Sequence, residues 1–210
     1  MKSRENVYYL FWIFIIGCVV GWCIEGVFSL IKWKEFINHS AVVIGPFNAA
    51  YGLGALVLTA LLFKFKDDKI WKIFLIGFIG GSILEYIMSL GMELVLGFTA
   101  WDYSRKPFNI NGRICVRYSL FWGALGIVWI KYIYPWLIKF IDKIDYDVGK
   151  KLAIWLSVFL LFDGILTGVA INRARHKEKG VEAKYKYEEI LDKTFNKEYL
   201  KNMYNDSWSD

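Results

Sequence analysis

Five long apolar segments determine what this chain can fold into. Each is close to the 20 or so residues that a helix needs to cross the hydrocarbon layer of a membrane, and each carries few charges. Of the 210 residues, 56% are hydrophobic, which indicates an integral membrane protein rather than a soluble domain with a large core. The expected spans are about 7–31, 46–65, 70–98, 114–137 and 152–171. The predicted fold is therefore all-α, a polytopic membrane helical bundle with about five transmembrane helices.

Two of these segments have matching sequences. Residues 13–30 read IFIIGCVVGWCIEGVFSL and residues 73–90 read IFLIGFIGGSILEYIMSL, and the two align without a gap. Glycine, glycine, glutamate and serine recur in both at intervals of four residues, which places them on one face of each helix. The matched positions are Gly17 with Gly77, Gly21 with Gly81, Glu25 with Glu85, and Ser29 with Ser89.

We interpret the match as an internal duplication of a helical hairpin, with repeat units at about 7–65 and 70–137. Because two spans separate the matched helices, both hairpins should enter the membrane in the same direction. This predicts two parallel hairpin repeats related by an axis along the membrane normal. The glycine pairs themselves indicate close helix contact.

The composition changes after residue 171, where a charged stretch ends the apolar sequence. We therefore divide the chain into a membrane domain, 1–171, and a soluble or membrane-surface tail, 172–210. Within 185–204 apolar residues recur at helical spacing, which predicts an amphipathic C-terminal tail helix on the bilayer or against the bundle. Small residues and a proline at 45–55 permit either a re-entrant approach or close helix packing.

The net charge of +6 comes from cations scattered between the apolar runs. This distribution suits anionic lipid headgroups better than nucleic acid, so the bilayer is an expected partner and nucleic acid is not. Cys18, Cys23 and Cys115 have neither disulfide nor metal spacing. No P-loop or recognised catalytic motif is present, so whether the chain is an enzyme stays open, and we expect no cofactor and no metal.

Intramembrane carboxylates are the first candidates for function. A charged side chain near the centre of a span costs about 2.5–3.5 kcal/mol, and such residues usually mark a pathway or a site. Glu25, Glu85 and Asp163 lie in spans that run in one direction, so we expect them in the same half of the bilayer. They would be protonated, face a hydrated cavity or meet a cation such as Arg113. The alternative is that they only hold helices together.

A short polar segment follows the third span and contains the sequence Trp101-Asp102-Tyr103-Ser104. With Asn109, Gly112 and Arg113 it predicts a structured loop over a cavity. The candidate residues for a polar pathway or binding site are Glu25, Glu85, Glu93, Trp101, Asp102, Tyr103, Ser104, Asn109, Arg113 and Asp163.

Three motifs carry a family resemblance. They are G-W-x-x-E at 21–25, G-P-x-x-x-x-Y-G-x-G at 45–54, and W-D-Y-S followed by N-x-x-G-R at 101–113. Over about 8–130 the chain resembles the family described as "Putative ABC-transporter type IV", the CmpB-like membrane proteins. The resemblance implies a multi-pass protein of the cell membrane that serves as a permease component.

Our first hypothesis is a permease subunit of an ABC-type transporter with a carboxylate-lined polar pathway. It requires a separate ATPase subunit and favours a homo-oligomer of membrane subunits. A second hypothesis is a membrane-embedded enzyme acting on a lipid-linked or amphiphilic substrate, with Glu85 or Glu93 as general acid or base and Arg113 binding an anionic group. A third is an ATP-independent ion or proton channel that uses Glu25 and Glu85.

Overall fold

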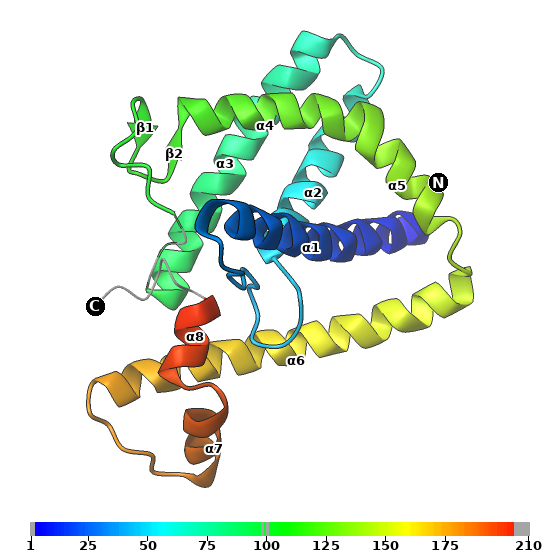
Figure 1. Ribbon diagram of the computed structural model, residues 1–210. Helices are drawn as coiled ribbons and strands as arrows, with labels where there is room; N and C mark the ends of the chain where they lie inside the picture. Colours follow the sequence, from blue (N-terminus) through cyan, green and yellow to red (C-terminus); the bar gives the residue numbers. More distant parts are fainter. Residues whose placement is uncertain (1–2, 98, 100, 204–210) are drawn as a thin grey trace.

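The computed structural model describes residues 3–97, 99 and 101–203, and it is a bundle of long helices with a two-helix tail (Figure 1). The helices are α1 (Ser3–Trp33), α2 (Ala49–Leu62), α3 (Ile70–Leu96), α4 (Val116–Val128), α5 (Tyr134–Ile141), α6 (Tyr146–Glu178), α7 (Lys186–Thr194) and α8 (Lys197–Met203). A 3-10 turn, η1 (Phe63–Phe65), extends α2, and a π turn, η2 (Trp129–Ile133), joins α4 to α5. Two short antiparallel strands, β1 (Asn109–Ile110) and β2 (Ile114–Cys115), form a hairpin.

Four helical segments in the described part of the chain are long and apolar enough to cross a membrane. They are Val7–Trp33, Ile70–Val95, Val116–Ile141 and Tyr146–Glu178. The expected second span is a shorter apolar helix, Ala49–Phe65. Its 17 residues would extend about 25 Å, slightly less than the hydrocarbon thickness. The all-α membrane bundle predicted from the sequence is confirmed.

Apolar side chains divide between the interior and an outward face. A core of buried residues from α1, α2, α3, η2 and α5 includes Ile13, Leu58, Leu62, Ile73 and Ile141. Other apolar residues point outward: Ile79, Ile83 and Ile87 recur every four residues along α3 and are each more than half exposed. A continuous apolar stripe on the outside of a helix is what lipid contact requires.

Between α1 and α2 the chain turns back along α1, and we call residues 34–48 the re-entrant segment. The amide of Asn48 donates to the carbonyl of Cys18 at 3.1 Å, which is 15 residues before the end of α1 and so about 22 Å along that helix. Trp22 Nε1 also donates to Asn38 Oδ1 at 2.7 Å. Asn48 then caps α2, its side chain accepting from the amide of Ala50. Consequently α2 begins well within the length of α1, three residues later than the sequence predicted.

The fourth span bends where its helical pattern widens. Pro135 has no amide hydrogen to donate to the preceding turn, and the π turn η2 lies directly before α5, which begins with Tyr134 and Pro135. Trp129, in that wide turn, donates its indole Nε1–H to Thr59 Oγ1 of α2 at 2.9 Å. The bend therefore comes with a polar contact that ties the fourth span to α2.

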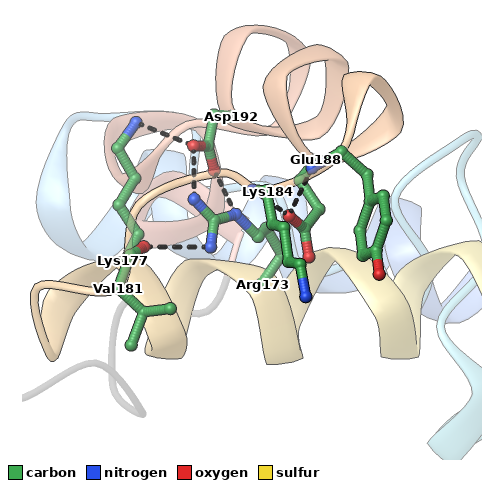
Figure 2. Close-up of polar contacts among 7 residues, drawn as sticks. Arg173, Lys177, Val181, Lys184, Glu188 and Asp192 are labelled. Atoms are coloured by element: carbon green, nitrogen blue, oxygen red, sulfur yellow. Dashed lines mark hydrogen bonds and ion pairs between the residues drawn. The ribbon is translucent and has the colours of Figure 1, made fainter.

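The tail packs against the end of α6 rather than extending away from it (Figure 1). The guanidinium of Arg173 holds both carboxylate oxygens of Asp192, at 3.0 and 2.8 Å, and also donates to the carbonyl of Val181 (Figure 2). Leu191 and Leu200 are buried with Ala170, Ile171 and Val43 in a second apolar cluster. The amphipathic pattern forms two short helices, because Phe195 ends α7 and Asn196 accepts from the amide of Tyr199 at the start of α8.

Candidate functional site

Residues 101–113, which precede and include the β1–β2 turn, form a compact loop. Asp102 Oδ1 accepts from the amide of Ser104 at 2.8 Å and from its hydroxyl at 2.5 Å. These bonds hold the pKa of Asp102 below its usual range. Asn109 Nδ2 donates to the carbonyls of Ser104 and Lys106, and its Oδ1 accepts from the amide of Gly112. Asp102, Ser104 and Asn109 therefore shape the loop, and their polar atoms are engaged with the loop itself.

Tyr103 connects this loop to the interior of the bundle. Its hydroxyl donates to Glu85 Oε1 at 2.9 Å, and its ring stacks on Tyr118 with centroids 4.4 Å apart. Burial is the main cause that raises the pKa of Tyr103, followed by the nearby Glu85 carboxylate. The other oxygen of Glu85 accepts from Trp122 Nε1 at 3.0 Å. Glu85 is only 8% exposed, and both of its oxygens are satisfied.

Arg113 is engaged on the outer side of the same loop. Its guanidinium pairs with Glu93 and donates to Ser89 Oγ at 3.2 Å. The pairing with Glu93 raises the pKa of Arg113 further. The backbone carbonyl of Arg113 accepts from Trp101 Nε1 at 3.0 Å. Trp101, Glu93 and Arg113 thus fix the base of the loop to α3, and the charge of Arg113 is already compensated.

Glu25 has its own aromatic partner on α2. The hydroxyl of Tyr51 donates to Glu25 Oε1 at 2.6 Å. A Cβ on Gly21 would lie 2.2 Å from the Tyr51 ring, so this glycine allows the ring to approach α1 closely. In the second hairpin, Trp122 takes the same position: a Cβ on Gly81 would lie 2.3 Å from its ring, and its indole donates to Glu85.

The match between the two hairpins extends about two turns further toward the start of α1 and α3. A Cβ on Gly52 would lie 2.8 Å from the ring of Phe14, and one on Gly123 would lie 2.6 Å from the ring of Phe74. Phe14 and Phe74 occupy equivalent positions in the two matched sequences. These paired contacts are what a duplicated hairpin would retain, and they support the duplication inferred from the sequence.

The two carboxylate pairs are neighbours. A Cβ on Gly54, which lies one helical turn after Tyr51, would be 3.0 Å from the ring of Trp122. Trp122 therefore lies between α2 and Glu85, and the pair of Glu85 with Trp122 lies one helical turn along α2 from the pair of Glu25 with Tyr51. We call these four residues the polar row; Tyr103 on the loop covers its Glu85 end.

Asp163 lies elsewhere, on α6 beside the re-entrant segment. Its Oδ1 accepts from the amide of Ile44 at 3.2 Å, and within the described residues no side-chain hydrogen bond joins it to the polar row. The sequence thus indicated three carboxylates, of which the structure brings two together. The sequence did not identify Tyr51, Trp122 or the hydrogen-bonded pair Ser82 and Ser119, because aromatic and small residues are common in membrane helices. The motif at 45–54 contains Tyr51 and was the one signal for that residue.

No three His, Cys, Asp or Glu side chains come together to hold a metal within the described residues. The arrangement is instead a set of membrane helices with a hydrogen-bonded polar row and a loop over one end, which defines a multi-pass membrane protein. A family model described as "Putative ABC-transporter type IV" matches residues 12–168, and the chain belongs to that family. It is therefore a membrane protein of a transporter family. No curated protein and no solved structure matches the chain.

Proposed function

We propose that this protein is the permease subunit of an ABC-type transporter in the cell membrane, and that the polar row is part of its transport pathway. The observation that carries the proposal is the repeated unit of a carboxylate, an aromatic donor and a glycine in two adjacent hairpins. Two buried or half-buried acidic groups held by neutral donors are expensive to keep in a membrane unless they are used.

The loop supplies a means of opening the row. Tyr103 is the loop residue that bonds to Glu85, so displacement of the loop would break that bond and leave Glu85 with one unpaired oxygen. A carboxylate released in this way binds water or a polar substrate group. In this proposal Asp102, Ser104 and Asn109 keep the loop rigid, so that it moves as one unit.

The enzyme hypothesis gains less support. It needs Arg113 as a receptor for an anionic group, whereas the guanidinium already contacts Glu93 and Ser89. It also needs Glu85 or Glu93 as general acid or base, whereas both oxygens of Glu85 accept hydrogen bonds and Glu93 is paired with Arg113.

A permease of this kind requires partners. The chain has no P-loop, so the energy source would be a separate ATPase subunit. Five membrane helices enclose little space, so we also propose that two membrane subunits assemble to complete the pathway.

Purification from native membranes tests the proposal. The tagged protein is extracted in mild detergent, and its stoichiometric partners are identified by mass spectrometry. We expect a P-loop ATPase in constant ratio to the chain, together with a mass that corresponds to more than one membrane subunit. Recovery of the chain without an ATPase, from membranes in which other transporter complexes stay intact, would contradict the proposal.

A further inference from the structure

The contact between α6 and the re-entrant segment buries Asp163 completely. Its side chain is 0% exposed. Oδ1 accepts from the amide of Ile44, whereas Oδ2 has no hydrogen-bond partner among residues 3–97, 99 and 101–203. One turn later, Thr167 Oγ1 accepts from the amide of Val43 at 2.9 Å and donates to the carbonyl of Asp163 at 2.7 Å.

The tail covers this contact from outside. Tyr199 of α8 donates its hydroxyl to the carbonyl of Val43 at 2.8 Å. Val43 is 2% exposed and packs in the apolar cluster that also contains Leu191 and Leu200 of the tail. Two backbone amides of the re-entrant segment thus bond to α6, and one of its carbonyls bonds to the tail.

No charge compensates Asp163 at this position. Along α6 it is the sole charged residue in 152–172, and Arg173 lies ten residues further on, about 15 Å along the helix. Arg173 is itself occupied by Asp192. Residues 40–47 of the re-entrant segment contain no titratable side chain. The titratable group that the tail brings to this contact is Tyr199, whose hydroxyl donates to the carbonyl of Val43.

An ionised carboxylate in this place would be a buried charge with one hydrogen bond and no counter-ion. A neutral carboxylic acid would leave a single hydroxyl group unpaired, which is a much smaller cost than an uncompensated buried charge. The two states differ by one proton on Oδ2. The lower cost of burial therefore favours the neutral acid form of Asp163.

We propose that Asp163 is a proton-binding site, which holds a proton on its unpaired oxygen whenever the re-entrant segment is docked on α6. Because the proton removes the buried charge, proton binding and docking of residues 43 and 44 stabilise each other. Loss of the proton would favour release of the segment and of Tyr199 above it. The site is separate from the polar row and does not depend on the transport function.

Infrared spectroscopy tests the protonation state directly. Spectra of the full-length protein and of Asp163→Asn are recorded at neutral pH in lipid nanodiscs. The expected difference is loss of the carbonyl stretch of a protonated carboxylic acid. Loss of an ionised carboxylate absorption instead would overturn the proposal. Asp102→Asn is the matched control, because Asp102 is exposed and accepts from Ser104, and its replacement should remove an ionised carboxylate.

A second measurement covers the case in which Asp163→Asn does not fold. Aspartate is labelled with carbon-13 in the unmodified chain, so that its carboxyl absorptions shift away from those of glutamate. The other described aspartates are exposed or, like Asp68 and Asp192, paired with a cation. A labelled carboxylic acid absorption that persists to neutral pH is therefore expected from Asp163, and its absence would overturn the proposal.

Discussion

The carboxylate of Asp192 ties the tail to α6. Asp192 receives two hydrogen bonds from Arg173, whose side chain is 6% exposed, and lies 3.6 Å from the ammonium of Lys177 (Figure 2). The bonds from Arg173, and to a smaller degree the charge of Lys177, hold the pKa of Asp192 below its ordinary value of 3.8. A group with a lowered pKa stabilises the folded chain at every pH above its ordinary value, and this contribution is lost as the pH falls through the lowered pKa.

We therefore predict that the tail undocks in acid. Between neutral pH and about pH 4 the amides of α7 and α8 should keep their protection from hydrogen exchange, and below pH 3.8 the protection should fall. At neutral pH, Asp192→Asn should cost about 3 kcal/mol, or roughly a hundredfold in protection, because it leaves Arg173 buried without its partner. Hydrogen exchange with mass spectrometry, corrected for the intrinsic exchange rate, measures both effects.

Glu189 provides the control on the same helix. It is exposed, and no hydrogen bond or ion pair of its side chain is seen within residues 3–97, 99 and 101–203, so Glu189→Gln should leave protection of the tail unchanged at neutral pH. Equal protection in Asp192→Asn and Glu189→Gln would show that the ion pair does not hold the tail.

Residue by residue, the sequence indicates the acidic members of the site better than their partners. Charges inside apolar runs are conspicuous, so Glu25, Glu85 and Asp163 can be found without a structure. Trp122 cannot, since it lies in a run of apolar and aromatic residues where an interfacial or lipid-facing ring is the ordinary interpretation. Tyr51 lies in the motif at 45–54, but the motif does not say which side chain it bonds. Their role depends on which helix faces which, and that is a property of the fold.

At the scale of helices, glycines decide how closely the hairpins pack. The glycine faces of α1 and α3 each receive a ring from the neighbouring helix, Tyr51 on Gly21 and Trp122 on Gly81. By contrast, a Cβ on Gly164 of α6 would meet nothing within 4 Å. Packing within the chain therefore requires glycine at Gly21 and Gly81 but not at Gly164.

Gly81→Ala should destabilise the bundle. The added Cβ would lie 2.3 to 2.6 Å from Cγ, Cδ2 and Cβ of Trp122, and these atoms lie too near the backbone to move independently. Overpacking of this kind costs about 1–3 kcal/mol, and displacement of the ring would also break its bond to Glu85. Thermal unfolding in detergent should show a lower midpoint.

Gly164→Ala is the matched substitution. Alanine is favoured over glycine within a helix by up to about 1 kcal/mol, and no atom of the described chain opposes it. The midpoint should be unchanged or slightly higher. A similar decrease in both variants would show that the glycine faces of the hairpins do not determine their packing.

Helix boundaries follow from the sequence where local chemistry sets them. Gly97 ends α3 in the left-handed conformation, with φ at 72°, as glycine does at many helix ends. The start of α2 could not be placed, because Asn48 is positioned by its bond to Cys18 in another helix. The helix α6 extends beyond the predicted span 152–171 at both ends, because its first turn is polar and capped by Asp145 and its last turns are polar and contact the tail.

For the molecule as a whole, the three segments that carry or cover the candidate carboxylates lie toward one end of the bundle. The C-terminal ends of α1, α3 and α6 carry the re-entrant segment, the loop with Tyr103, and the tail, respectively (Figure 1). Successive spans alternate in direction, so counting them in the sequence already places the ends of the first, third and fifth spans on the same side. The division into a polar row and a separate Asp163 site does not follow from that count, because it depends on the re-entrant segment lying between α1 and α6.

A transport pathway along the polar row requires that water reach these residues, and thiol labelling tests this directly. Cys18, Cys23 and Cys115 are first replaced by serine, and Glu85→Cys and Ile87→Cys are then made separately. The two positions differ in depth by about 3 Å, but Glu85 is 8% exposed in the polar row whereas Ile87 is 60% exposed on the apolar outer stripe of α3.

Each variant is reconstituted in vesicles and treated with a membrane-impermeant thiol reagent on one side and then on both. We predict that Glu85→Cys reacts from one side and that Ile87→Cys does not react, since lipid covers it. No reaction of Glu85→Cys from either side, or equal reaction of the two variants, would contradict a water-reached pathway along the polar row.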